Sequence, residues 1–182
     1  MLWIWLTFEK VNKMPYQHHT SSPIPRKIKT MTEPNYWLMK SEPDAYSIDT
    51  LKNDGVTLWD GIRNYQARNF MRKMNKGDKV FFYHSNCKPP GIVGLMEVID
   101  LNIVDPTQFD QDSKYFDPKS KPDNPRWDCV KVEYKFKSDK ILSLPELKNL
   151  FNEDELLVVK KGNRLSILPV RNDIAKILLE KI

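Results

Sequence analysis

Residues 58–86 of the chain read LWDGIRNYQARNFMRKMNKGDKVFFYHSN. The spacing of the apolar side chains predicts a helix that begins at Arg63 or Asn64 and ends near Met74. A Gly-Asp turn follows, and residues 79–84 form a nearly continuous apolar run, which is typical of a strand covered on both faces. Polar and aromatic residues stand at the ends of these elements, where rigid scaffold holds binding groups. This stretch therefore predicts both a piece of core and part of a site.

The rest of the chain continues the mixture of strands and helices. Apolar runs and turn signals predict strands over 36–40, 56–59, 91–101, 127–136 and 164–168. Capping residues and helical spacing predict short helices over 48–52, from Ser143, over 152–159 and over 171–182. Gly94, inside a strand, indicates a bulge or a close backbone approach. The non-consecutive strands favour an α+β domain with a curved sheet or small barrel flanked by helices.

Size and composition exclude several classes of protein. The chain has 182 residues and 40% hydrophobic content, which suits one domain with a sizeable core. No apolar run approaches the roughly 20 residues of a membrane span. Two cysteines, Cys87 and Cys129, indicate a reducing compartment rather than a disulfide framework. The three histidines, His18, His19 and His84, give no zinc spacing with them, so we expect no metal and no cofactor.

The first 34 residues differ from the remainder, and we expect two parts, 1–34 and 35–182. Residues 16–30 are polar and Pro-containing, which is typical of disorder. Two interpretations stay open: a flexible tail, or an upstream extension before a true start at Met31. The segment 26–29 is too sparse for a nuclear signal. We therefore expect a bacterial cytoplasmic protein, with a nuclear protein as the alternative.

The net charge of +5 is unevenly distributed. Residues 1–34 carry five basic and two acidic residues, whereas residues 35–182 carry 24 and 22. A protein that grips many phosphates has a stronger positive field than this. If the folded part meets nucleic acid, it is expected to use one local pocket and few backbone contacts.

The sequence offers little catalytic chemistry. It has no Gly-rich phosphate loop and no Gly-x-Ser-x-Gly. His84 and Cys87 could form a base–nucleophile pair, but catalytic pairs usually come from distant segments. The carboxylates of the N-terminal third lie beside Pro, Ser and Gly, which favours turn and cap roles: Glu42, Asp44, Asp49, Asp54 and Asp60. A hydrolase or nuclease using His84 is one alternative; a partner-binding module using the long 105–125 loop is another.

Several aromatic residues lie beside turns. Filling the core is the ordinary role of large aromatics. Trp59 and Trp127, however, stand where full burial is harder, and flat walls with a few polar groups suit an unstacked base. Amides and hydroxyls that could read the edge of a base are Ser41, Asn64, Ser85, Asn86 and Ser166. Guanidinium groups that could hold phosphates are Arg63, Arg68 and Arg164.

Motifs in a fixed order carry a family resemblance. They are 36–43 (YWLMKSEP), 59–69 (WDGIRNYQARN), 77–78 (GD), 83–86 (YHSN), 91–94 (GIVG), Trp127 and 164–166 (RLS). Over about residues 35–182 the chain resembles an EVE domain, especially the thymocyte nuclear protein family. Asn163 stands where that family leads us to expect serine.

The resemblance implies a PUA-like fold, in which a mixed sheet curls into a partial barrel. It implies a non-catalytic reader whose partner is nucleic acid carrying methyl- or hydroxymethylcytosine, or modified RNA. We also expect a monomer that has no cofactor and does not bind a membrane. The base-binding residues carried over are Trp37, Ser41, Trp59, Asn64, Tyr83, Ser85, Trp127 and Ser166. The expected phosphate contacts are Arg63, Arg68 and Arg164.

Overall fold

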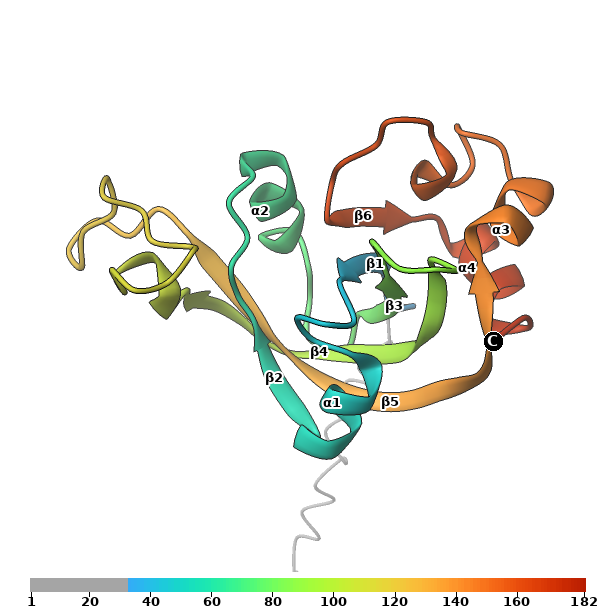
Figure 1. Cartoon of the computed structure of the whole chain (residues 1–182), viewed down its shortest axis with the longest axis horizontal. Helices are drawn as coiled ribbons and strands as arrows, with labels where there is room; N and C mark the ends of the chain where they lie inside the picture. The colour runs from blue at the N-terminus through green and yellow to red at the C-terminus, as the bar shows by residue number, and fades with distance from the viewer. Residues whose placement is uncertain (1–32) are drawn as a thin grey trace, which may run out of the picture. The chain divides into compact units, whose positions relative to one another are not determined.

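A mixed sheet organises residues 33–182, the part of the chain that the computed structural model describes (Figure 1). Its strands are β1 (Tyr36–Ser41), β2 (Val56–Trp59), β3 (Lys79–His84), β4 (Gly91–Val104), β5 (Asp128–Ser143) and β6 (Ile167–Val170). Their spatial order is β2-β5-β4-β3-β1-β6. The pair β1–β3 is parallel and the other pairs are antiparallel. The expected α+β, PUA-like mixed sheet is confirmed; it is curved but not closed.

Four α-helices flank the described sheet: α1 (Ile48–Asp54), α2 (Tyr65–Met71), α3 (Leu144–Leu150) and α4 (Asn172–Leu179). Three of these helices have side-chain caps at their N-termini. The Ser47 hydroxyl accepts from Thr50 N before α1, and Asn64 Oδ1 accepts from Gln66 N and Ala67 N before α2. Ser143 and Glu146 form a capping box before α3. Such contacts satisfy amides that a helix leaves unpaired at its first turn.

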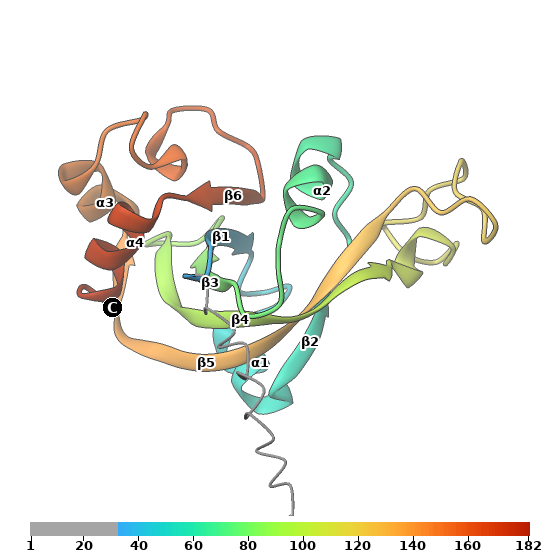
Figure 2. The same cartoon turned by 180° about the vertical axis from the view of Figure 1, so that it is seen from behind.

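Hydrophobic clusters lie on both faces of the sheet. In β1, Trp37 and Met39 point into the cluster that α1 and α2 cover, whereas Leu38 points into the cluster that α3 and α4 cover. Figures 1 and 2 show α3 and α4 beside each other near the C-terminus. Residues 80–83 of β3 are all buried, as expected for a strand covered on both faces.

The β4–β5 ribbon is long and irregular. Its register shifts at several places, one of them between Ile92 and Gly94. A Cβ on Gly94 would lie 2.4 Å from the carbonyl oxygen of Phe136, so only glycine fits there. The expected bulge and close backbone approach at Gly94 are both present. Shifts of this kind bend strands and increase their twist.

Three expected elements need correction. The helix expected over 152–159 is wrong: turns lead into a 3₁₀ helix, η2 (Leu157–Val159), because Asn152 Oδ1 caps the amides of a tight turn. The strand expected over 164–168 is β6, shifted towards the C-terminus by its pairing with β1. The strand expected over 127–136 continues to Ser143, because β4 pairs with it along that whole length.

The sequence predictions for the N-terminal part fall on residues 1–32, outside the described residues. Within residues 33–182, no helix has the length and apolar character needed to cross a membrane.

Candidate functional site

A cavity of about 690 Å³ opens where β1 and β3 end and β6 begins. Backbone hydrogen bonds hold these ends together. Lys40 N donates to Ser166 O at 2.8 Å, and Ser85 N donates to Ser41 O at 2.9 Å. The three serines, distant in sequence, therefore line one cavity. The segment from Trp59 to Arg63, which joins β2 to α2, forms another wall.

Six of the predicted site residues line the cavity. Four were predicted to bind the base and two to contact phosphate: Ser41, Trp59, Ser85 and Ser166, and Arg63 and Arg164. Arg164 forms no ion pair within residues 33–182. Trp59 is 7% exposed and packs edge-on against Phe82, with ring centroids 5.3 Å apart. The indole is thus held rigidly by the core behind it.

Other predicted base-binding residues lie elsewhere. Trp37 is a core residue whose Nε1 donates to Asp78 Oδ2 at 2.9 Å. Asn64 caps α2, and Tyr83 lines a second, smaller cavity. Burial raises the pKa of Tyr83 to about 12, so its hydroxyl stays protonated at neutral pH.

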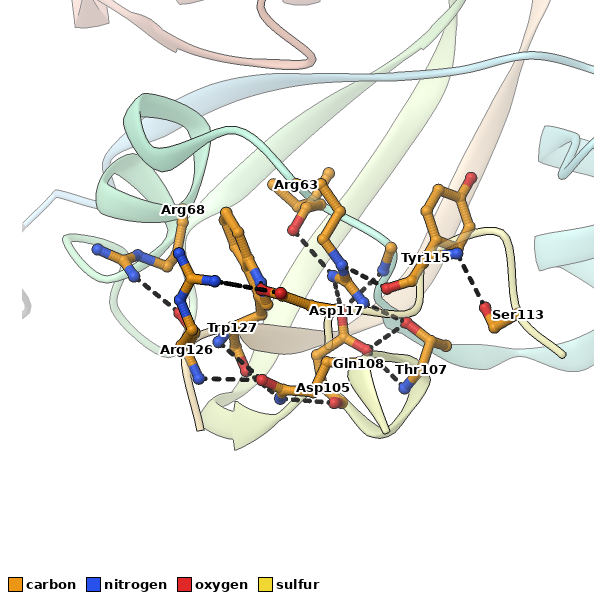
Figure 3. A network of polar contacts seen from close by, with 12 residues as sticks. Arg63, Arg68, Asp105, Thr107, Gln108, Ser113, Tyr115, Asp117, Arg126 and Trp127 are labelled. Atoms are coloured by element: carbon orange, nitrogen blue, oxygen red, sulfur yellow. Dashed lines mark hydrogen bonds and ion pairs between the residues drawn. The ribbon is translucent and has the colours of Figure 1, made fainter. Parts of the chain in front are cut away.

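Trp127 is enclosed by other side chains rather than open to a ligand (Figure 3). Its Nε1 donates to Asp117 Oδ2 at 2.6 Å, and its ring stacks on Tyr65 with centroids 4.9 Å apart. The guanidinium carbons of Arg63 and Arg68 lie 5.4 and 5.6 Å from its centroid. These arginines therefore use their faces for cation–π contacts inside the protein.

Arg63 and Arg68 are committed to contacts within the chain. Arg63 donates to Asp105 Oδ2 at 2.7 Å, to Tyr115 O at 2.6 Å and to Thr107 Oγ1 at 2.8 Å. Arg68 Nη1 donates to Arg126 O at 2.7 Å. Of the three arginines predicted to contact phosphate, Arg164 alone is exposed. It forms no ion pair within residues 33–182.

The Arg63 contacts bring the segment between β4 and β5 onto the cavity (Figure 3). Asp105, fully buried, begins this segment, and Gly61 N donates to its carboxylate at 2.9 Å. Tyr115 lies so close to Gly61 that a Cβ there would be 2.6 Å from its ring, and Gly61 has φ +72°. Glycine is therefore required for both reasons. Lys114 and Tyr115 complete the cavity wall.

Sequence reasoning missed several cavity residues. Lys40 and Glu42 flank Ser41, so adjacency to a predicted residue was a usable signal. Asp60, assigned to a turn, also lines the cavity; burial and then the charge of Asp105 raise the pKa of its carboxyl group. Tyr115 carried no local signal, because its place depends on contacts made about 50 residues earlier in the chain.

The His84–Cys87 pair has other partners. His84 Nε2 accepts from Ile48 N at 3.1 Å, and Cys87 Sγ donates to Pro89 O at 3.4 Å. Burial raises the pKa of the Cys87 thiol, which disfavours the nucleophilic thiolate. Both cysteines are free. In residues 33–182, no three His, Cys, Asp or Glu side chains gather as metal ligands.

The His84 contact predicts a stability that depends on pH. Burial is the largest effect and lowers the pKa of His84 below 6.5. The charge of Asp49 raises this pKa, and the charge of Lys137 lowers it. The neutral ring is preferred in the folded state, so this stabilisation is complete above pH 6.5 and is lost as the pH falls through the folded pKa. We expect urea melts between about pH 7.5 and 5.5 to show a decline that H84Q reduces. An identical decline in both proteins would contradict this role.

Comparisons with known proteins identify relatives over most of residues 33–182. The EVE domain family matches residues 35–181. Thymocyte nuclear protein 1 of Homo sapiens is 41% identical over 157 residues, covering 76% of this chain and 70% of that protein. Matches to the rat and mouse proteins of the same name span 55% of their length.

Solved structures agree with this result. A protein from Pseudomonas syringae is 43% identical, with a TM-score of 0.76, and the match covers 81% of this chain and 99% of that chain. Human THYN1 protein, solved in complex with DNA containing 5-methylcytosine, is 39% identical, with a TM-score of 0.75, over 81% of this chain and 96% of that chain.

Proposed function

This chain belongs to the EVE domain family, and we propose that it is a non-catalytic reader of modified bases in nucleic acid. The ligand that we favour is 5-methylcytosine or hydroxymethylcytosine in DNA, with modified RNA as a related ligand. The observation that carries the proposal is the cavity at the strand ends, which combines an indole wall with polar groups. The DNA complex of human THYN1 supports the choice of ligand.

The size and the lining of the cavity support the binding of an extruded base. Its volume of about 690 Å³ lies within the range of small-molecule sites. Trp59 lines the cavity, and Phe82 packs edge-on against its indole. Enzymes and readers that extrude a base replace its lost stacking with aromatic or apolar side chains. Trp59 is the residue that we assign to this role.

Groups that suit a cytosine edge surround this wall. The exocyclic N4 amino group of cytosine donates hydrogen bonds that carboxylates can accept. Glu42 and Asp60 both line the cavity and can supply such an acceptor. The hydroxyl groups of Ser41, Ser85 and Ser166 can donate to the ring acceptors or accept from the amino group. This pattern of donors and acceptors favours cytosine.

The engagement of His84 with Ile48 and the raised pKa of Cys87 favour binding over catalysis. The segment between β4 and β5 directs Tyr115 towards the cavity, which favours a role in the site over a separate partner-binding role. The monomeric state, the bacterial cytoplasm and the nuclear alternative stay predictions.

The test compares two oligonucleotides that differ at a single cytosine, unmodified or 5-methylated. Burying a methyl group is worth about 0.8 kcal/mol, which corresponds to roughly fourfold tighter binding. We therefore expect the dissociation constant for the unmodified strand to be roughly four times that for the methylated strand. Fluorescence anisotropy of labelled strands at a fixed salt concentration measures both constants. An oligonucleotide with the methylcytosine moved to another position is a control for sequence context. Equal dissociation constants for methylated and unmethylated strands would overturn the proposal.

A further inference from the structure

A second cavity of about 350 Å³ opens beside the first. Lys40 and Ser85 line both cavities. The segment that leads into β6 also borders both, because Lys160 and Lys161 line the second cavity whereas Arg164 lines the first. A ligand chain that enters one cavity can therefore continue into the other.

The two cavities differ in charge. Glu42 and Asp60 line the first, but no Asp or Glu is among the residues that line the second. Its charged residues are all cations: Lys40, Lys148, Lys160 and Lys161. None of these four lysines forms an ion pair within residues 33–182. The carboxylate closest in the hydrogen-bond network, Glu153, accepts from the backbone N of Lys161 at 3.2 Å. The cavity is suited to an anion.

Lys40 is the half-buried member of this group. Its Nζ donates to Asn163 O at 3.4 Å and lies 6.0 Å from the centroid of the Tyr83 ring. An ammonium group has three donors, so two remain for a ligand. Burial lowers the pKa of Lys40, and a bound anion would offset that penalty.

Nucleic acid brings such an anion with every base. Each nucleotide is joined to its neighbours by charged phosphates, so a base in the first cavity places a phosphate within reach of the adjacent strand ends. Arg63 and Arg68 are engaged inside the protein, as described above. The four lysines of the second cavity, and Arg164 at the first, form no ion pair within residues 33–182. Phosphate contacts of this kind position a ligand without reading its sequence.

We propose that the second cavity binds the backbone phosphate next to the modified base, through Lys40, Lys160 and Lys161. The inference rests on the proposed function, since the position of the phosphate is fixed by a base in the first cavity. The phosphate contacts of the second cavity then contribute to affinity, and the first cavity discriminates between bases.

The experiment measures how the dissociation constant for the methylated and unmethylated oligonucleotides depends on salt concentration. The test variant is K160A/K161A, which replaces two exposed lysines of the second cavity. The control is K176A/K181A, which removes the same charge from exposed positions that line neither cavity. Each phosphate contact contributes about 0.7–0.9 to the slope of log K against log salt. We expect K160A/K161A to lose about one such unit and to bind both strands roughly tenfold more weakly at 0.1 M salt, with the methylation ratio unchanged.

The outcomes separate the two proposals. An unchanged slope in K160A/K161A, or an equal change in K176A/K181A, would overturn the phosphate site even if methylated DNA is preferred. Equal binding of the two strands by the unaltered protein would overturn the proposed function, and the slopes would still decide the phosphate site. A lack of binding to either strand would overturn both.

Discussion

D105N is expected to lower the free energy of unfolding by about 3–5 kcal/mol, the range for breaking a buried ion pair. One oxygen of Asp105 accepts from Gly61 N and Arg63 Nη1, and the other accepts from Thr107 N and Thr107 Oγ1. An asparagine keeps one of these acceptors and turns the other into a donor. Either orientation leaves buried donors unpaired and Arg63 without its counter-charge.

Urea denaturation monitored by circular dichroism measures this loss. The matched control is D173N, because Asp173 pairs with Arg171 at 2.9 Å on the surface, where ion pairs contribute about 0–1 kcal/mol. We also expect D105N to weaken base binding, since Asp105 and Arg63 hold the segment that carries Tyr115. A variant as stable as the parent would show that the Asp105 contacts do not organise this wall.

W59L is expected to weaken binding of the methylated oligonucleotide by roughly 5- to 150-fold. This range corresponds to about 1–3 kcal/mol for the loss of stacking on one base. Leucine retains apolar volume in the core but offers no aromatic face. The measurement is anisotropy of a labelled strand at a protein concentration corrected for the folded fraction.

W37L is the control for W59L. Trp37 and Trp59 are buried to almost the same extent, 6% and 7% exposed, but only Trp59 lines the cavity. We expect W37L to destabilise the fold, because Asp78 loses the indole donor, and to leave the affinity of the folded protein unchanged. If both variants weaken binding equally, or if neither does, Trp59 has no stacking role.

Local sequence patterns were sufficient to predict most elements. The sequence predicts helix starts at Ser47 and Asn64, and both side chains cap the helices that follow them. The apolar run of β3 is buried on both faces. These features depend on neighbouring residues, so a single sequence contains the information that decides them. The false helix over 152–159 arose because acidic residues after an Asn suit a tight turn as well as a helix.

The candidate site was harder to predict because it depends on partners far apart in the chain. Arg63 and Arg68 were expected to face phosphates, yet their partners are Asp105 and the carbonyl of Arg126. Trp127 was expected to face a base, but Tyr65 and the arginines cover it. A charged or aromatic side chain has many possible partners in a sequence, and burial selects one of them only when the chain folds.

The sequence by itself determined the order of the strands and helices along the chain, the residues that begin several of the helices and the family to which it belongs. The segment 58–86 contains a helix and a buried strand because its periodicity and its caps act over a few residues. Only the tertiary structure decided which side chains share a cavity. It brought together Ser41, Ser85 and Ser166 because β1, β3 and β6 lie side by side, with β1 and β3 ending where the antiparallel β6 begins.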